Sequence, residues 1–282
     1  MYMSKSTLCA RVVGGLGNQL FIYAFARSQS LKNKCKVVFD METGFANDNY
    51  GRSPKLGKYI PDLPLASKKT IYLFYLTKLF PILSRILFKS EIVVEPDSRK
   101  FFDLNPESFR NRSNLFVQGY FQSYLYSNEF AEQIKSEIKL DFRRTELIKD
   151  LTNQISCSNA VSIHVRRVEY SDLLGLNYYL KAIEIIKNRI DSPVFFIFSD
   201  DIGWCERNLP DSKSFTFVTH DLPDEAADLW LMTQCKHHII ANSSFSWWGA
   251  WLSENTNKIA VAPAQTQIGV KDLLYPKNWV TI

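Results

Sequence analysis

The stretch LCARVVGGLGNQLFIYAFARSQSLKNKCKVVFD, Leu8–Asp40, decides the fold of this chain. Leu8–Val13 predicts a short strand, Gly14–Asn18 a glycine-rich turn, Gln19–Leu31 a helix and Lys36–Asp40 a second strand. A strand, a helix and a second strand in this order form a βαβ unit, whose parallel sheet needs cover on both faces. We therefore expect an α/β fold.

The rest of the chain repeats this alternation of short apolar strands and helices. Further strands are predicted at Leu115–Tyr120, Ala160–Val165, Pro193–Ser199, Phe215–Val218, His238–Ala241 and Lys258–Ala262. Further helices are predicted at Phe130–Gln154, Tyr178–Arg189 and Asp224–Cys235, and from Ser243 onward. The succession predicts two doubly wound, Rossmann-like α/β domains, residues 1–155 and 156–282. Ligands of such sheets bind beyond the carboxyl ends of the strands.

The composition is that of a globular protein with an uneven charge. Of the 282 residues, 46% are hydrophobic and 22% are charged, which excludes a disordered chain. Residues 1–150 carry 23 Lys and Arg against 15 Asp and Glu, whereas residues 151–282 carry 11 against 14. A basic half suits an anionic ligand or surface, although a scattered solvated face has the same composition. The basic residues form no single run, so we expect no nucleic-acid partner.

The cysteines and histidines indicate neither a disulfide framework nor a metal site. Five dispersed cysteines without a CxxC pair are typical of reduced thiols in the cytoplasm. Cys235, His237 and His238 come nearest to a metal-binding group, but adjacent residues of a strand point to opposite faces. We therefore expect a cytoplasmic protein without a structural metal.

The most hydrophobic segment is Ile71–Phe88, IYLFYLTKLFPILSRILF. A lysine, a proline, a serine and an arginine interrupt it, so it lacks the ~20 continuous apolar residues of a membrane-spanning helix. Its aromatic residues and the flanking Lys68, Lys69 and Lys89 are typical of a segment at a membrane interface. The alternative, a buried or helix-packing segment, is slightly favoured.

Small and polar residues fill the turn after the first strand. Gly15 and Gly17 permit a ligand to approach the backbone, and Asn18 and Gln19 offer amide donors and acceptors. The turn lacks the last glycine of a dinucleotide-binding fingerprint and the lysine of a P-loop. A tight turn without a ligand is therefore an equal alternative.

Two arginines follow the strand that ends near His164. In an extended chain His164 and Arg166 share one face and Arg167 points the opposite way. Guanidinium groups match the geometry of phosphate oxygens, so these arginines are candidates for phosphate binding. A structural ion pair with Glu169 is the alternative for one of them.

Two further strand ends carry polar groups. Asp200 and Asp201 offer paired carboxylates for ribose hydroxyls, a base edge, a metal or acid–base chemistry, and helix capping is favoured for at least one. Asn242, Ser243 and Ser244 precede a helix, where they cap free N–H groups in a geometry that also binds anions. Together with the arginines and the glycine-rich turn, these groups suit a nucleoside-diphosphate ligand.

Six motifs resemble glycosyltransferase family 11, the bacterial and animal α-1,2-fucosyltransferases. They are GGLGNQLFIYAFARS at Gly14–Ser28, GYFQS at Gly119–Ser123, HVRRVEY at His164–Tyr170, FSDD at Phe198–Asp201, HHIIANSSFSWWGAWL at His237–Leu252 and YPKNWVTI at Tyr275–Ile282. The motifs run in order through nearly the whole chain. HxRR and SSFSWWGAWL are more specific together than either is alone.

The resemblance implies a GT-B architecture, in which two Rossmann-like domains face a cleft. Residues 1–155 would form the acceptor side, and residues 156–282 would bind GDP-fucose. The implied reaction is an inverting, metal-independent transfer of L-fucose from GDP-β-L-fucose to the 2-hydroxyl of a galactose-containing oligosaccharide. The basic half and segment Ile71–Phe88 add an expected peripheral contact with the inner face of a membrane, in the synthesis of O-antigen or another surface polysaccharide.

The resemblance also implies roles for single residues. Arg166 would hold the β-phosphate, and His164, one of the paired aspartates and the segment Ser243–Phe245 would help to hold GDP. Asn18 would reach the phosphate or the sugar. The family usually has Gly-Asp-Tyr where this chain has Val-Glu-Tyr, and Glu169 is our first candidate for the general base. We expect four residues to be catalytic: Arg166, His164, Glu169 and Asn18.

Two other functions stay open. A transferase that uses a different GDP-linked sugar would keep all the contacts to GDP. A non-catalytic protein that binds a GDP-sugar or a glycan would bind without turnover, and the change at Glu169 is its only support. The sequence gives no motif for the identity of the acceptor.

Overall fold

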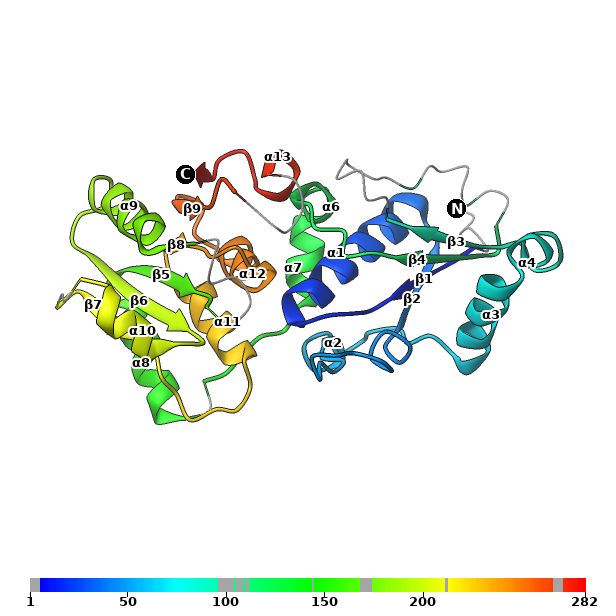
Figure 1. Cartoon of the computed structure of the whole chain (residues 1–282), viewed down its shortest axis with the longest axis horizontal. Coiled ribbons are helices and arrows are strands. Elements are labelled where there is room, and N and C mark those ends of the chain that lie inside the picture. The colour runs from blue at the N-terminus through cyan, green and yellow to red at the C-terminus, as the bar shows by residue number, and fades with distance from the viewer. Residues whose placement is uncertain are drawn as a thin grey trace. The chain divides into compact units, whose positions relative to one another are not determined.

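The chain folds into two compact units, each with one parallel sheet (Figure 1). The computed structural model describes residues 6–95, 104, 109, 112–143, 145–167, 174–210, 213–265 and 271–282. Unit 1 is Met1–Lys139 and unit 2 is Leu140–Ile282. Helices connect the parallel strands in both units, which confirms the predicted α/β fold class.

The sheet of unit 1 has the strand order β2-β1-β4-β3, and its strands are parallel. The strands are β1 (Thr7–Arg11), β2 (Lys36–Asp40), β3 (Ser90–Val94) and β4 (Asn114–Gln118). The helices are α1 (Leu16–Asn33), α2 (Leu56–Tyr59), α3 (Lys68–Leu79), α4 (Pro81–Leu87), α6 (Tyr124–Asn128) and α7 (Ala131–Glu137). Helix α1 packs on β1 and β2, while Phe74 of α3 packs on Cys9 and Phe116 on the opposite face. The βαβ unit predicted for Leu8–Asp40 is confirmed.

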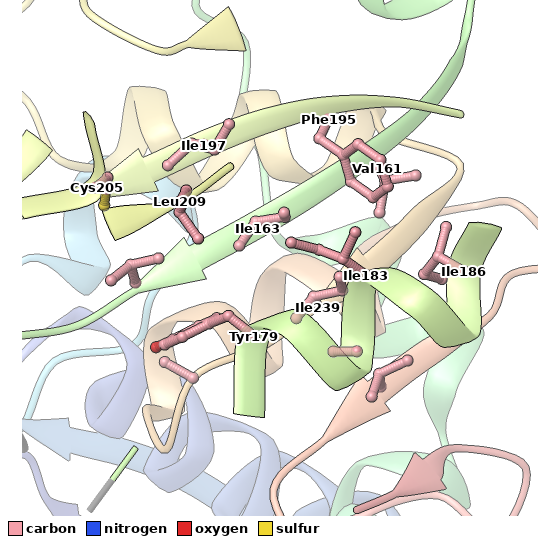
Figure 2. Packing of buried hydrophobic residues seen from close by; sticks show 14 of the residues in the cluster. Val161, Ile163, Tyr179, Ile183, Ile186, Phe195, Ile197, Cys205, Leu209 and Ile239 are labelled. Carbon is pink, nitrogen blue, oxygen red and sulfur yellow. The ribbon is translucent and has the colours of Figure 1, made fainter. Parts of the chain in front are cut away.

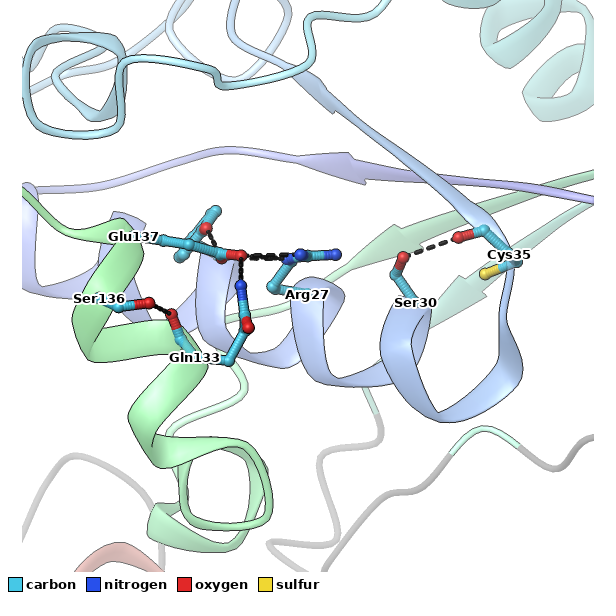
Figure 3. Close-up of polar contacts among 7 residues, drawn as sticks. Arg27, Ser30, Cys35, Gln133, Ser136 and Glu137 are labelled. Carbon is cyan, nitrogen blue, oxygen red and sulfur yellow. Dashed lines mark hydrogen bonds and ion pairs between the residues drawn. The ribbon is translucent and has the colours of Figure 1, made fainter. Parts of the chain in front are cut away.

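A polar cluster ties α7 to α1 (Figure 3). Glu137 of α7 accepts hydrogen bonds from the guanidinium of Arg27, with its Oε1 2.7 Å from Nη2, and from the hydroxyl of Tyr23. Gln133 of α7 also donates to Glu137. Because ionic hydrogen bonds are short and directional, this cluster fixes the position of α7 on α1.

The sheet of unit 2 has the strand order β10-β9-β8-β5-β6-β7, and its strands are also parallel. The strands are β5 (Asn159–Val165), β6 (Pro193–Ser199), β7 (Phe215–Phe217), β8 (His237–Ile239), β9 (Ala260–Ala262) and β10 (Val280–Thr281). The helices are α8 (Glu146–Ser156), α9 (Leu176–Lys187), α10 (Ile202–Asn208), α11 (Ala226–Gln234), α12 (Ser244–Leu252) and α13 (Lys271–Leu274). This order is that of a Rossmann sheet, in which the strand order reverses between the first and the fourth strand, here β5 and β8.

The core of unit 2 lies between its sheet and α9 (Figure 2). Val161, Ile163 and Ile197 point from the sheet toward Tyr179 and Ile183 of α9, and all five side chains are buried. Helices α8, α11 and α12 cover the opposite face. Burial on both faces explains the near-continuous apolar runs of these strands.

The boundary between the units differs from the expected position at residues 155 and 156. The compact units divide after Lys139, and the predicted helix Phe130–Gln154 is wrong, because the chain leaves the helix after Glu137 and begins α8 at Glu146. The backbone N–H of Lys139 donates to the carbonyl oxygen of Tyr59 in unit 1, whereas α8 packs on β5 and α11 of unit 2. The polar pattern of residues 130–154 predicts one long helix, so it did not reveal that the chain passes from unit 1 to unit 2 within this segment.

Segment Ile71–Phe88 forms most of α3 and all of α4. Phe74 is buried, but nine other large apolar side chains of α3, α4 and their ends are 44–76% exposed. Of the slightly favoured interpretation, burial is therefore wrong for most of the segment, whereas helix packing is confirmed, since α3 and α4 pack on each other and on β3. Among the described residues, no helix is both long and apolar enough to cross a membrane.

Candidate functional site

The carboxyl ends of β5, β6 and β8 bring together the polar residues predicted in the second half of the chain. Strand β5 lies between β6 and β8, and Val165 of β5 is in register with Ser199 of β6. Parallel strands end at the same edge of a sheet, so the residues after β5 and β6 emerge side by side. Segment Asn242–Ser244 follows β8 and leads into α12. The resulting cluster lies at the switch point of the sheet, where such folds bind ligands.

Asp200 connects the two arginines after β5. Its Oδ2 lies 3.3 Å from Nε of Arg166, and its Oδ1 accepts a hydrogen bond from the backbone N–H of Arg167 over 2.8 Å. The guanidinium of Arg167 turns the other way and lies 4.3 Å from the ring centre of Trp204 in α10. The prediction that the two arginines point in opposite directions is confirmed. Arg166, with its side chain 34% exposed, is the arginine that lies at the switch point.

Asp201 acts as a helix cap. Its Oδ1 accepts a hydrogen bond from the backbone N–H of Trp204 over 2.8 Å, at the start of α10, and its own N–H donates to Oγ of Ser199 over 2.9 Å. The capping interpretation is confirmed for this aspartate. Among the described residues, no three His, Cys, Asp or Glu side chains lie together as a metal-binding group.

His164 is buried beneath the cluster. Its side chain is 6% exposed, its ring centre lies 5.8 Å from that of Phe245 in α12, and its Nδ1 has no hydrogen-bond partner within the part of the chain that the structure describes. Burial, assisted by the charge of Arg166 and opposed by that of Asp200, lowers the pKa of His164 to about 3. The ring is therefore neutral near pH 7 and offers a hydrogen bond but no positive charge.

The N-terminus of α12 completes the cluster. Ser243 is the N-cap residue, and its Oγ accepts a hydrogen bond from the backbone N–H of Phe245 over 3.3 Å. Asn242 is buried and Ser244 half-buried. Fully buried Trp247, which donates from Nε1 to the carbonyl oxygen of Leu274, holds the first turn of the helix in the core. A helix start with a partly positive end is suited to an anion.

In unit 1, two residues of the glycine-rich turn, Gly14 and Gln19, support the backbone of the turn itself. Gly14 has φ +79°, in the left-handed region that favours glycine. Gln19 is fully buried, and its Nε2 donates to the carbonyl oxygens of Gly14 (2.8 Å) and Ser53 (2.9 Å), while its Oε1 accepts from the N–H of Lys55 (2.8 Å). The Gln19 amide is thus engaged with the backbone at both ends and supports the turn from inside.

The remaining residues of the turn are placed differently. Gly17 is buried in the first turn of α1, whereas a Cβ atom at Gly15 would meet no atom within 4 Å. Gly15 therefore borders open space at the N-terminus of α1, as a close approach of a ligand requires. Asn18 is half-buried, and its Oδ1 accepts a hydrogen bond from Nε2 of Gln122 over 2.8 Å.

Gln122 contacts the candidate residue Asn18, although sequence reasoning did not single it out. It follows β4, which lies beside β1, and its loop is held by Phe121, whose ring stacks on Phe25 of α1 with 3.8 Å between ring centres. The carboxylate of Glu95 accepts hydrogen bonds from the N–H groups of Tyr120 (2.7 Å) and Phe121 (2.8 Å). The signal in the sequence was the GYFQS motif itself, but only the strand order places its glutamine beside Asn18. Glu169, the candidate base, lies outside the described residues.

The two Rossmann-like units have the GT-B fold, and an arginine and a helix N-terminus lie at the switch point of the second unit. The fucosyltransferase NodZ from Bradyrhizobium has this fold: it is 18% identical, with a TM-score of 0.52 over 86% of this chain and 92% of its own. The protein belongs to glycosyl transferase family 11, because the family model matches residues 7–282.

Two bacterial relatives support the same assignment. An alpha-1,2-colitosyltransferase of Escherichia coli is 34% identical, covering 98% of this chain and 99% of its own. The O-antigen biosynthesis glycosyltransferase WbnK of Escherichia coli is 28% identical, covering 95% of this chain and 98% of its own. The predicted family is thereby confirmed, and the reaction class is sugar transfer.

Proposed function

We propose that the protein transfers L-fucose from GDP-β-L-fucose to the 2-hydroxyl of a galactoside, with inversion and without a metal ion. The observation that carries the proposal is the cluster at the switch point of unit 2, where Asp200 pairs with Arg166 and the ring of the buried, neutral His164 lies 5.8 Å from that of Phe245 in the first turn of α12. A guanidinium, an uncharged hydrogen-bonding ring and a helix N-terminus are the groups that a diphosphate leaving group needs.

These groups favour the transition state over the bound donor. As the bond between the anomeric carbon and the phosphate oxygen breaks, negative charge grows on GDP and positive charge on the sugar ring. Arg166 and the N–H groups at Ser243–Phe245 would stabilise that leaving phosphate, and His164 would donate a hydrogen bond to it. A fixed guanidinium and a fixed helix dipole need no reorganisation during the reaction, and this supports a metal-independent mechanism.

The acceptor hydroxyl attacks the anomeric carbon from the opposite face and gives up its proton. We assign this proton to Glu169, because the Asn18 amide cannot act as a base. Asn18, supported by Gln122, would instead bind the phosphate or the sugar through its amide. In this assignment Asp200 and Asp201 have positioning and capping roles rather than metal binding.

A second candidate donor is favoured by one of the comparisons. The relative that is 34% identical is named an alpha-1,2-colitosyltransferase. Colitose is fucose without its 3-hydroxyl group, so a GDP-linked donor of either kind would make the same contacts through GDP and leave through the same phosphate. Fucose is our first choice of donor sugar. The enzyme would discriminate fucose from colitose only if a protein group forms a hydrogen bond with the 3-hydroxyl of fucose.

The acceptor belongs to the same proposal. The relative named for O-antigen biosynthesis supports a role in a surface polysaccharide. We place the acceptor on a lipid carrier, so that the enzyme works at a membrane face, and the exposed apolar surface of α3 and α4 supports this location.

The test is a GDP-release assay in EDTA with GDP-fucose, with and without a panel of β-galactosides, and with GDP-colitose in parallel. We expect release that depends on the acceptor, and a product in which NMR shows a 2-linked galactose. Faster turnover with GDP-colitose would change the donor assignment. Binding of GDP-fucose without release for any acceptor would support the non-catalytic alternative, and loss of all release in EDTA would contradict metal independence.

A further inference from the structure

Unit 1 carries an exposed apolar surface on α3 and α4, which we call the α3–α4 surface. Its large side chains are Tyr72 (65% exposed), Tyr75 (45%), Leu79 (68%), Phe80 (55%), Ile82 (76%), Leu83 (52%), Ile86 (70%), Leu87 (62%) and Phe88 (44%). Scattered exposed apolar residues are normal on a protein, but a contiguous set of this size marks an interaction site.

The surface is not needed to hold the two helices in place. In α3, Phe74 and Thr77 face the sheet, while Tyr72, Tyr75 and Leu79 lie on the other side of the helix at i, i+3 and i+7. Helix α4 begins at Pro81 and buries only Ser84, so its four large apolar residues contribute little to folding. Both helices lie beside the edge strand β3 in Figure 1.

The segment that carries this surface has charges of one sign. Residues 63–90 contain no Asp or Glu, and the basic residues among them are all exposed. They are Lys68, Lys69, Lys78, Arg85 and Lys89. Long basic side chains at the rim of an apolar surface keep their charges at the level of lipid phosphates while their methylene groups lie on the apolar side.

We propose that the α3–α4 surface docks unit 1 onto the interface of a bilayer that contains anionic phospholipids. The apolar side chains of α4 enter the boundary between head groups and acyl chains, Tyr72 and Tyr75 lie at the head-group level, and the basic residues meet the lipid phosphates. Binding of this kind lies in the plane of the interface and needs no membrane-spanning helix.

The charge distribution favours a lipid surface over a second copy of the chain. In a two-fold symmetric dimer the same surface packs against itself, so five cations would face five cations without an anion from residues 63–90 between them. An anionic bilayer instead supplies opposite charges at every point of the rim, and its acyl chains accept apolar side chains of any shape.

This inference does not rest on the proposed reaction. A protein with a different donor or acceptor would bind lipid through the same surface, and lipid binding without fucosyl transfer would leave the surface assignment intact.

The test is flotation of the purified full chain with vesicles of phosphatidylethanolamine and phosphatidylglycerol, at low and high salt, with pure phosphatidylcholine vesicles for comparison. The apolar variant replaces four exposed residues of α4: Ile82→Gln, Leu83→Gln, Ile86→Gln and Leu87→Gln. The charge variant replaces the five basic residues: Lys68→Gln, Lys69→Gln, Lys78→Gln, Arg85→Gln and Lys89→Gln.

Matched controls change the same residue types elsewhere. The apolar control is Leu147→Gln with Leu180→Gln, two exposed leucines of unit 2. The charge control replaces exposed basic residues of unit 2 by glutamine: Lys181, Lys187, Arg189, Lys213 and Lys277. Because every changed side chain is exposed, unfolding temperatures should stay close to that of the unchanged protein.

We expect the unchanged protein and both controls to float with the anionic vesicles at low salt and to bind phosphatidylcholine weakly. Each removed charge should lower the partition coefficient roughly fivefold, and the apolar variant should lose binding at both salt concentrations. Two results would overturn the proposal: no flotation of the unchanged protein, or equal flotation of the apolar variant and its control. The surface would instead be assigned to a second copy of the chain by a different result. In that case the unchanged protein would not bind lipid and would sediment as a dimer, and the apolar variant alone would sediment as a monomer.

Discussion

Nε2 of Gln122 donates a hydrogen bond to Oδ1 of Asn18 over 2.8 Å, and this bond joins the loop after β4 to the first turn of α1, which follows the neighbouring strand β1. Gln122 thereby fixes which way the Asn18 amide points. With its oxygen held by Gln122, the Asn18 amide presents its Nδ2 donor elsewhere, and a donor suits an anionic or hydroxyl-bearing ligand.

The first prediction concerns this pair. Asn18→Ala should lower kcat/KM at least tenfold, and Gln122→Ala about fivefold, because the latter removes one hydrogen bond worth about 1 kcal/mol from a positioning residue. The double variant should lose less than the product of the two factors. Initial rates of GDP release measure all three, with Asn33→Ala at the other end of α1 as control. Gln122→Ala with unchanged kinetics would contradict the positioning role.

Gln19, next along the chain, should behave in the opposite way. Gln19→Glu keeps an acceptor for the N–H of Lys55 but loses the donor to the carbonyl oxygens of Gly14 and Ser53, all within a buried site. The free energy of unfolding should fall by about 1–3 kcal/mol. Well below the unfolding temperature, the KM for the donor should remain close to that of the unchanged protein. Denaturant unfolding, with exposed Gln154→Glu as control, separates this structural role from ligand binding.

Arg166 should be essential for transfer and dispensable for folding. Arg166→Ala should lower kcat by about 10²–10³-fold, because it removes a fixed positive group from the leaving phosphate, and Arg166→Lys should recover little since a lysine lacks the planar fork. Asp200→Asn, which keeps the shape but weakens the ion pair, should have a smaller effect. The control Arg189→Ala changes an exposed arginine of the same unit. Normal fucosyl transfer by Arg166→Ala would refute the phosphate assignment.

His164 should make the protein sensitive to acid. Its pKa is lowered from 6.5 to about 3 by burial, so below pH 6.5 the unfolded chain takes up a proton that the folded protein does not. The stability linked to this neutral ring is fully present above pH 6.5 and is lost as the pH falls toward 3. His164→Gln should therefore give a shallower fall of the free energy of unfolding between these pH values.

His220 provides a control of opposite sign. Its hydrogen bond with Asp228, 3.0 Å long, outweighs burial and raises the pKa of His220, so its contribution is present below its ordinary pKa and is lost as the pH rises through the raised value. His220→Gln should alter the upper part of the profile. If the free energy of unfolding of His164→Gln fell with pH below 6.5 as steeply as that of the unchanged protein, this would contradict a neutral, buried His164.

The sequence predicts those parts of the fold that depend on local pattern. Lys36–Asp40 and Pro193–Ser199 form the predicted strands to the residue, because buried parallel strands are short, apolar runs between turn signals. The strand Ser90–Val94 was not predicted, since its short SEIVV pattern beside an apolar helix gives no clear alternation. Phe130–Gln154 was misassigned because its polar residues suit either one helix or two helices with a link.

The candidate site shows a similar division. The direction of Arg166 and Arg167 followed from the two-residue period of a strand, and the capping by Asp201 from its position before a helix. Long-range contacts did not follow. Nothing local shows that the Gln19 side chain turns inward to Ser53, because such a bond depends on how a distant loop packs on α1.

The cluster that holds α7 against α1 leads to the last prediction. Burial raises the pKa of Glu137, but hydrogen bonds from Arg27, Tyr23 and Gln133 outweigh it and lower the pKa overall. A lowered pKa means that the ionised carboxylate stabilises the fold above its ordinary pKa of 4.5, and that this stability is lost as the pH falls further. Glu137→Gln should thus lower the free energy of unfolding by about 1 kcal/mol at pH 7 and by less in acid.

The matched control for Glu137→Gln is Glu146→Gln on α8. Glu146 also forms an ion pair, 2.6 Å from Nζ of Lys149, but its side chain is 83% exposed. Exposed pairs one turn apart on a helix contribute at most a few tenths of a kcal/mol, since water and salt screen them. Urea unfolding measures the free energy of unfolding of both variants at pH 7 and near pH 4. The two values should differ at pH 7 and become similar near pH 4. Equal stability at pH 7 would show that Tyr23 and Arg27 hold α7 without the carboxylate charge.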